Sequence, residues 1–246
     1  MLGVAVDCVR MDGAIAEIVR LVEQRRSGTV RETALVATVN PEFVMRARRD
    51  RAFRGALDSA ALRVPDGSGV VWALRRAGHR DAERVAGVDL VPRLARACAT
   101  RGFSLYLLGA RAGVAATAAD RLRTLAPGLQ VAGAEPGSPR PEDDVATAAS
   151  IRAASPDVLL VAYGAPTQEV WVARNRGRLG VPVAIGVGGA FDLIAGRVRR
   201  APVAWQRLRL EWAWRLWREP WRAWRMAVLP EFALLVLFGA SRHRPT

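Results

Sequence analysis

The sequence predicts an α/β protein with a Rossmann-like, largely parallel sheet flanked by helices. Short apolar runs recur between residues 33 and 187 of the 246-residue chain, and helix-like stretches separate them. Most of these runs are apolar throughout rather than alternating, which is typical of strands covered on both faces. The expected strands are Thr33–Val39, Ala61–Val64, Ser104–Leu108, Leu129–Gly133, Asp157–Tyr163 and Pro182–Val187.

Two of the intervening stretches carry the clearest helix signals. Val114–Leu125 and Asp143–Ala154 place apolar residues at helical spacing. Each stretch ends shortly before a proline, Pro127 or Pro156, and proline stops a helix because it lacks the amide hydrogen. Strands and helices therefore alternate along the chain, as they do in a parallel sheet with helical crossovers.

Composition and charge limit the kind of partner. The chain is 51% hydrophobic and 24% charged, with two cysteines, which excludes disordered, collagen-like and disulfide-scaffold proteins. Lys+Arg 37 against Asp+Glu 23 gives a net charge of +14, and every one of these cations is arginine. Such an excess favours an anionic partner, which is a nucleic acid, an anionic membrane face or a phosphorylated substrate.

The composition changes after about Gly196, so we divide the chain into an α/β catalytic domain, 1–196, and a helical appendage, 197–246. Pro220 is expected to split the appendage into two helices. Indoles and guanidinium groups in such numbers suit an element at a membrane interface, and a Trp-lined packing contact is the alternative. The apolar tract Met226–Gly239 is shorter than the roughly 20 residues that cross a bilayer. Six of the eight tryptophans of the chain lie in the appendage: Trp205, Trp212, Trp214, Trp217, Trp221 and Trp224.

Polar residues follow the first two expected strands. In open α/β sheets ligands bind at the carboxyl ends of the strands. Thr38 and Asn40 close the first strand, either as hydrogen-bonding groups for a polar ligand or as a strand exit with Asn40 capping the next helix. Asp66 follows the second strand, either as a base for a sugar hydroxyl or as part of a Pro-Asp-Gly turn that caps a helix.

Three later strand ends carry glycines. Gly109 opens a turn that could admit a phosphate, although the G-x-G-x-x-G spacing of a dinucleotide site is missing. Gln168 and Glu169 begin a helix, where Glu169 can complement the helix dipole. Gly188 lies in a Gly-rich turn that lets the backbone approach a ligand, with Asp192 one turn later, and helix–sheet packing is the alternative.

Several chemistries lack the residues that they need. His79 and His243 are the only histidines, and the chain has no lysine for a P-loop and no D-x-D triplet. A metal site is therefore not expected, and Ser-His or Cys-His catalysis lacks parts. An enzyme built from these residues would depend on a carboxylate base and on arginine or amide electrophiles.

Taken in order, short motifs along nearly the whole chain resemble the WecB/TagA/CpsF family, glycosyltransferase family 26. Thr167 stands where a lysine is common in that family, and Gly137-Ser138 replaces a glycine-aromatic pair. The motifs are T-x-N (Thr38, Asn40), PDG (Pro65–Gly67), R-V-x-G-x-D (Arg84 to Asp89), LYLLG (Leu105–Gly109), GAPxQE (Gly164–Glu169), GVGGAFD (Gly186–Asp192), RAP (Arg200–Pro202) and EW…R…EP…R..R (Glu211 to Arg225).

The resemblance implies an inverting hexosyltransferase of cell-surface polysaccharide biosynthesis, making teichoic acid, exopolysaccharide or capsule. It implies a UDP-sugar donor (N-acetylmannosamine, its uronic acid or glucose) and a polyprenyl-diphosphate-linked acceptor. Because the sequence offers no obvious metal site, we expect no metal cofactor. It makes Asp66 the general base, with Thr38, Asn40, Arg84 and Gln168 around the sugar and diphosphate. We add Gly109, Gly188 and Asp192 as substrate-binding candidates, and the resemblance adds three arginines of the appendage: Arg215, Arg222 and Arg225.

The resemblance also implies a place at the membrane. The protein is expected in the cytoplasm, peripheral on the inner face of the plasma membrane, with anionic lipid as a partner. Asp7 and Asp12 come too early for a signal peptide. The sequence leaves the oligomeric state open, a homo-oligomer included. Two alternatives remain: a basic nucleic-acid-binding protein, which would explain the net charge, and a nucleotide-dependent oxidoreductase using the Gly109 turn.

Overall fold

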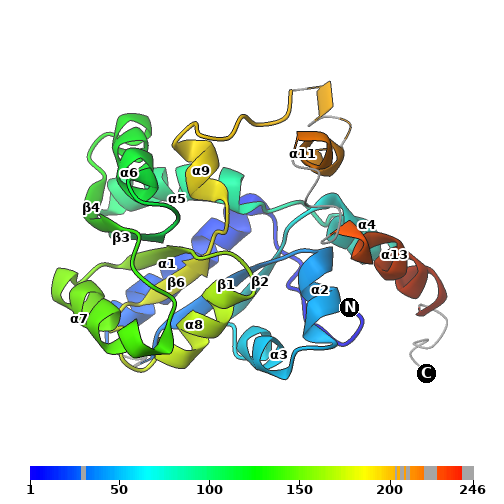
Figure 1. The fold of residues 1–246 in the computed structure, drawn as a ribbon, viewed down its shortest axis with the longest axis horizontal. Coiled ribbons are helices and arrows are strands. Elements are labelled where there is room, and N and C mark those ends of the chain that lie inside the picture. Colours follow the sequence, from blue (N-terminus) through cyan, green and yellow to red (C-terminus); the bar gives the residue numbers. More distant parts are fainter. Residues whose placement is uncertain (29–31, 203, 206–207, 209–210, 219–225, 240–246) are drawn as a thin grey trace.

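A computed structural model describes residues 1–28, 32–202, 204–205, 208, 211–218 and 226–239 of the chain. These residues form a six-stranded sheet in which neighbouring strands are parallel, in the order β2-β1-β6-β5-β3-β4 (Figure 1). The predicted α/β class with a largely parallel sheet is therefore confirmed. The strands are β1 (Ala34–Val39), β2 (Leu62–Pro65), β3 (Ser104–Gly109), β4 (Gln130–Glu135), β5 (Val158–Ala162) and β6 (Val183–Gly186).

Each of the six predicted strands is present, and the differences lie at their ends. β2 extends to Pro65 because that residue pairs with Val39 in the ladder with β1. β4 extends to Glu135, two residues beyond the predicted end, because it pairs with β3 as far as Leu108. A neighbouring strand thus decides where each of these strands stops.

Helices cover both faces of the sheet and bury two apolar cores. One face is covered by α1 (Met11–Arg26), α5 (Gly87–Arg101), α6 (Val114–Leu125) and α9 (Ala190–Ile194). The other is covered by α2 (Pro41–Ala47), α3 (Arg51–Asp58), α7 (Asp144–Ala154) and α8 (Thr167–Asn175). Figure 1 shows α5, α6 and α9 on one side of the strands and α3, α7 and α8 on the other. Nearly all side chains of β1, β3, β5 and β6 are buried on both faces, which explains why these runs are apolar throughout, whereas none is buried in the edge strand β4.

The two clearest helix predictions are confirmed. Helix α6 has the predicted bounds. Helix α7 begins one residue later than predicted, because Pro141–Asp143 forms a 3₁₀ turn, η1, ahead of it.

The described part of the C-terminal region contains helices, as predicted, although residues 197–202 are not helical. Helix α11 spans Glu211–Arg218 and helix α13 spans Val228–Gly239. Helix α13 packs against α2 and α4 (Ser68–Arg76), with Phe232 and Val236 buried in the core of the α2 face. Pro220 lies outside the described residues, and the division at residue 196 stays a prediction. Among the helices described, none has the length and apolar content needed to cross a membrane.

Candidate active site

A cavity of about 410 Å³ lies at the carboxyl ends of four adjacent strands, β2, β1, β6 and β5. A larger hollow of about 790 Å³, beside α2 and α3, contains none of the predicted site residues. The smaller cavity brings together residues that are far apart in the sequence, as expected for an open α/β sheet. Six of the predicted site residues line it: Thr38, Asn40, Asp66, Arg84, Gln168 and Gly188.

Several helices begin at the wall of this cavity, among them α4, α5 and α8. Ser68 opens α4, Gly87 opens α5 and Gln168 lies in the first turn of α8, and all three line the cavity. The first turn of a helix carries unpaired N–H groups and the positive end of the helix dipole. Converging helix N-termini therefore favour a negatively charged ligand, such as a diphosphate, in this cavity.

Asp66 lies directly after β2 at the edge of the cavity. Its backbone N–H donates to Val39 O at 2.7 Å, which continues the β1–β2 ladder by one hydrogen bond. Gly67 follows with φ of +85°, a conformation that glycine adopts without the steric cost of a side chain. The N-cap of α4 is Gly67, not Asp66. Asp66 is therefore half-buried at the strand tip, and Gly67, which follows it, lies next to Asn40 and Pro41.

Thr38 and Asn40 both take part in local structure. The Asn40 side chain accepts from Phe43 N at 3.0 Å, so the prediction that Asn40 caps the following helix is confirmed. Thr38 Oγ1 donates to Gly186 O at 3.1 Å and ties the end of β1 to β6. Both side chains also line the cavity, so capping and ligand contact are compatible at these positions.

Gln168 joins two loops of the cavity. Its side-chain oxygen Oε1 accepts from Gly164 N at 3.1 Å and from Gly188 N at 3.0 Å. Its side-chain nitrogen Nε2 donates to Glu169 Oε1 at 2.7 Å. The Gln168 side chain is only 2% exposed. Gln168 therefore holds together the loops that follow β5 and β6.

Arg84 belongs to a cluster of four charges that attaches α11 to the α/β core. Arg84 pairs with Asp89 at 3.2 Å and with Glu211. Arg200 pairs with Asp89 at 2.7 Å and with Glu211 at 2.9 Å. Burial alone would raise the pKa of Glu211, but Arg200 and Arg84 bring it below its usual value. The cluster holds the start of α11 next to the cavity.

The remaining predicted site residues lie elsewhere. Gly109, with φ of +108°, packs β3 against β5, since a Cβ there would lie 2.7 Å from Ala162 C. Asp192 lies in α9, where its backbone oxygen accepts from the N–H groups of residues 197 and 198. Neither residue lines the cavity at the ends of β1 and β2. Arg215 lies in α11 with its side chain undescribed, and Arg222 and Arg225 lie outside the described residues.

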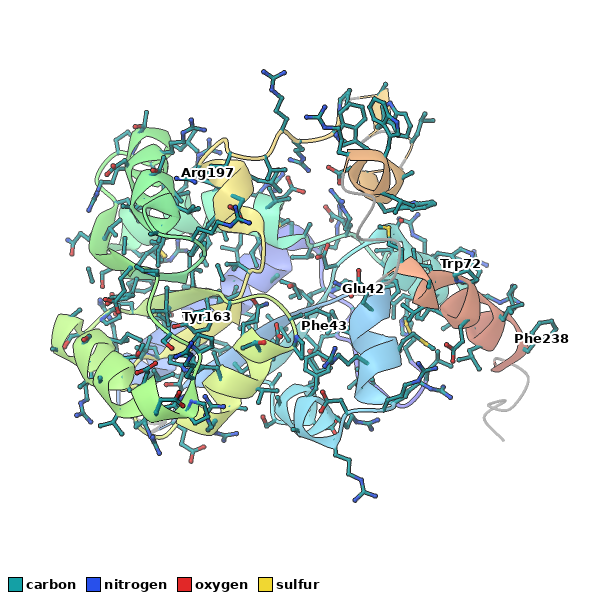
Figure 2. The ribbon with its side chains drawn as sticks, viewed as in Figure 1. Glu42, Phe43, Trp72, Tyr163, Arg197 and Phe238 are labelled. Carbon is teal, nitrogen blue, oxygen red and sulfur yellow. The ribbon has the colours of Figure 1, made fainter. Side chains whose placement is uncertain are left out.

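Several lining residues were not predicted from the sequence. Glu42 and Phe43, at the start of α2, line the cavity, as does Trp72 of α4 (Figure 2). Glu42 follows Asn40-Pro41, so its position one residue after a strand-end motif is the signal that could have found it. The C-terminal region completes the wall with Glu211, Trp212, Met226, Leu229, Phe232 and Ala233.

Within the part of the chain that the structure describes, no three or more His, Cys, Asp or Glu side chains gather as a metal site would require. Among the described residues, the charged side chains that line the cavity are those of Glu42, Asp66, Arg84 and Glu211. Their arrangement places one carboxylate, that of Asp66, at a strand tip, and the helix N-termini beside it.

A carboxylate at the strand tips and a wall of helix N-termini suit an α/β enzyme that removes a proton from one substrate and binds a phosphorylated one. The sequence matches the "Glycosyl transferase WecG/TagA/CpsF family" over residues 1–245. The chain therefore belongs to this glycosyltransferase family, which confirms the resemblance, and it is a hexosyltransferase.

Two relatives are similar over most of the chain. One, from Bacillus subtilis (strain 168), is named N-acetylglucosaminyldiphosphoundecaprenol N-acetyl-beta-D-mannosaminyltransferase and is 36% identical over 204 residues. The other, from Bacillus spizizenii (strain ATCC 23059 / NRRL B-14472 / W23), carries the same name and is 34% identical over 204 residues. Each match covers 83% of this chain and 79% of the relative.

Proposed function

We propose that this protein transfers N-acetylmannosamine from its UDP-sugar to a polyprenyl-diphosphate-linked saccharide, with inversion at the anomeric carbon. The names of the two Bacillus relatives support this donor sugar over a mannosaminuronic acid or glucose, and they support a diphosphoundecaprenol-linked N-acetylglucosamine as the acceptor. The product would enter a cell-surface polymer such as teichoic acid. A single observation carries the proposal: Asp66 stands at a strand tip in a cavity lined by helix N-termini.

The chemistry follows from that placement. Asp66 takes the proton of the acceptor hydroxyl while the oxygen of that hydroxyl forms a bond to the anomeric carbon of the donor. The bond between that carbon and the diphosphate oxygen breaks, and the electron pair leaves with UDP. Asn40, which lines the same cavity, offers the nitrogen of its amide to the sugar, because its oxygen is already used by Phe43 N. Asp66 is then the catalytic residue and Asn40 a binding residue.

The negative charge that develops on the departing diphosphate needs a counter-charge. The N-termini of α4, α5 and α8 line the cavity, and Arg84 lies on the same wall. Guanidinium groups bind phosphate oxygens in a bidentate fork. We therefore propose transfer without a metal cofactor. Turnover by purified protein should be unchanged by excess chelator, and loss with chelator followed by recovery with magnesium or manganese would overturn this part.

The C-terminal helix supports a place at the membrane surface. Helix α13 buries Phe232 but leaves Leu234, Leu237 and Phe238 exposed, the last at 72% (Figure 2 shows Phe238 at its outer end). Trp72 of α4, at the cavity wall, is also exposed. Apolar side chains beside a cavity for a lipid-linked acceptor suit contact with lipid. We propose a peripheral protein on the cytoplasmic face of the plasma membrane.

Vesicle sedimentation tests this placement. The double variant Leu234→Glu with Phe238→Glu should bind anionic phospholipid vesicles at least tenfold more weakly, because each apolar side chain contributes about 1.5–3 kcal/mol on burial. The matched control is Leu125→Glu on α6, where an exposed leucine lies on another face of the molecule. Equal binding by all three proteins would contradict membrane contact through α13. Light scattering of the unmodified protein would determine the oligomeric state, which the sequence leaves open.

A panel assay tests the activity itself. Purified protein is incubated with UDP-N-acetylmannosamine, UDP-N-acetylmannosaminuronic acid or UDP-glucose, and with a short-chain prenyl-diphosphate N-acetylglucosamine acceptor. Mass spectrometry should find the acceptor heavier by one N-acetylhexosamine in the first reaction only. The Asp66→Asn protein serves as the negative control. Transfer from another UDP-sugar would revise the donor, and no transfer from any would refute the proposal.

A further inference from the structure

Helix α8 begins with two consecutive polar side chains that are both buried. Gln168 is 2% exposed and Glu169 is 0% exposed. From the sequence, Glu169 was expected as a first-turn acid that complements the helix dipole. Instead its carboxylate lies inside the protein, above the end of β6, and carboxylates are seldom buried without a cation beside them.

The hydrogen bonds around this pair have a fixed direction. The amide of Gln168 has one oxygen, and the N–H groups of Gly164 and Gly188 both require that oxygen. Its nitrogen must then face an acceptor, and Glu169 Oε1 at 2.7 Å is that acceptor. If Glu169 offered no oxygen there, this nitrogen would be buried without an acceptor whenever the oxygen holds both N–H groups. Glu169 therefore stabilises the amide orientation in which Gln168 joins the two loops.

The end of β6 is shaped to hold the pair. A Cβ at Gly186 would lie 2.4 Å from Glu169 Oε1 and 2.6 Å from Gln168 Nε2, so a side chain at this position would displace both groups. The backbone oxygen of Gly186 also accepts from Thr38 Oγ1. One glycine thus makes room for the buried pair on β6 and joins it to the end of β1.

Burying the Glu169 carboxylate lowers the free energy of unfolding, a cost that a buried apolar side chain would not have. Its second oxygen, Oε2, has no hydrogen-bond partner within the described ranges of the chain. Burial raises the pKa of Glu169 to about 7, while the hydrogen bond from Gln168 acts in the opposite direction. A leucine would fill similar space without this cost, but it would leave the Gln168 nitrogen without an acceptor. The acceptor oxygen is therefore the feature of Glu169 that the site uses.

We propose that Glu169 is a positioning residue for glycosyl transfer, which acts through Gln168 to hold the loops after β5 and β6 against the donor. These loops contribute Gly164, Ala165, Gly188 and Gly189 to the cavity wall. Glu169 itself touches no substrate. The inference depends on the proposed sugar transfer, because it assigns the two loops to the nucleotide-sugar.

Three variants test this role in the full-length protein. Glu169→Gln keeps an oxygen that can accept from Gln168, and its kcat/KM should stay within about threefold of the wild-type value. Glu169→Leu removes the acceptor and should lower kcat/KM at least tenfold, mainly by raising KM for the UDP-sugar, because the loops contact bound donor. Gly186→Ala should have the same effect as Glu169→Leu, because its Cβ would displace the pair.

Exchanging the side chains of residues 168 and 169 gives a second test, which decides the question if Glu169→Leu fails to fold. Gln168→Glu alone places two carboxylates together in the interior and should abolish most activity. Adding Glu169→Gln lets the new amide donate to the new carboxylate, which can still accept from both N–H groups. The double variant should therefore recover at least tenfold in kcat/KM over Gln168→Glu. No recovery would contradict the proposal.

A matched control separates positioning from general stability. Asp144 is 3% exposed and pairs with Arg174 at 2.6 Å on the same side of the sheet, away from the cavity. Asp144→Asn should lower the melting temperature but leave KM unchanged in assays well below that temperature. If Glu169→Leu behaves in the same way, Glu169 is structural only and the proposal is wrong. If the wild-type protein transfers no sugar, the proposed function fails instead.

Discussion

Replacing Glu169 by glutamine should remove a pH-dependent loss of stability. Burial raises the pKa of this carboxyl from an ordinary 4.5 to about 7. Below pH 4.5 the folded and unfolded chains both keep the proton, so the group has no effect on the free energy of unfolding. Between pH 4.5 and 7 only the unfolded chain releases it, which favours unfolding increasingly as the pH rises.

The size of the effect follows from the two pKa values. A difference between 4.5 and about 7, at about 1.4 kcal/mol for each pH unit, corresponds to about 3 kcal/mol above pH 7. Glutamine has the shape of the protonated acid but does not ionise. The Glu169→Gln protein should therefore match the wild type within about 1 kcal/mol at pH 5 and exceed its stability by about 3 kcal/mol at pH 8.

Urea unfolding followed by far-UV circular dichroism measures both proteins at each pH. Comparing the variant with the wild type at the same pH cancels the titration of other groups, such as Asp144 and Glu211, whose pKa values are lowered. The reasoning would be refuted by a stability difference that is the same at pH 5 and pH 8. That result would mean that the carboxyl ionises in the folded protein as readily as in the unfolded chain.

Two further substitutions address the catalytic residue and the sheet. Asp66→Asn should keep the fold and the affinity for UDP while lowering kcat by about 10²–10⁴-fold, the usual contribution of a general base. Calorimetric titration measures the affinity for UDP, and a turnover assay measures kcat. Undiminished turnover would remove Asp66 from the mechanism. Gly109→Ala should destabilise the protein by at least about 1–3 kcal/mol, because φ is +108° and the added Cβ would meet Ala162 C at 2.7 Å. Thermal unfolding measures this loss, and an unchanged melting temperature would show that β3 and β5 can separate at no cost.

The strands could be predicted from the sequence because their environment is uniform. Both faces of β3 and β5 are buried, so their runs contain few polar residues and stand out from the helices. Their ends were less certain, since hydrogen bonds from a neighbouring strand determine them. The extension of β4 to Glu135 depends on pairing with Leu108, which lies 27 residues earlier in the chain, and no local pattern contains that information.

The site could be predicted in part for a related reason. Parallel strands bring their carboxyl ends to one edge, so Thr38, Asn40 and Asp66 could be placed together before any contact was known. The burial of Glu169 could not, because it depends on the missing side chain of Gly186 in another strand. The contribution of α13 was hidden too, since an apolar helix does not show which of its sides meets the core.

The position of Phe232 in the cavity wall limits how far the C-terminus of this protein can be shortened. Its ring lies 3.7 Å from the position of a Cβ at Gly69, and it forms part of the cavity wall from a point far along the chain. A truncated form ending before Val228 would leave Phe43 and its neighbours on α2 uncovered, with one side of the cavity open to water. Removing C-terminal residues to improve solubility or crystallisation would therefore alter the candidate active-site cavity itself.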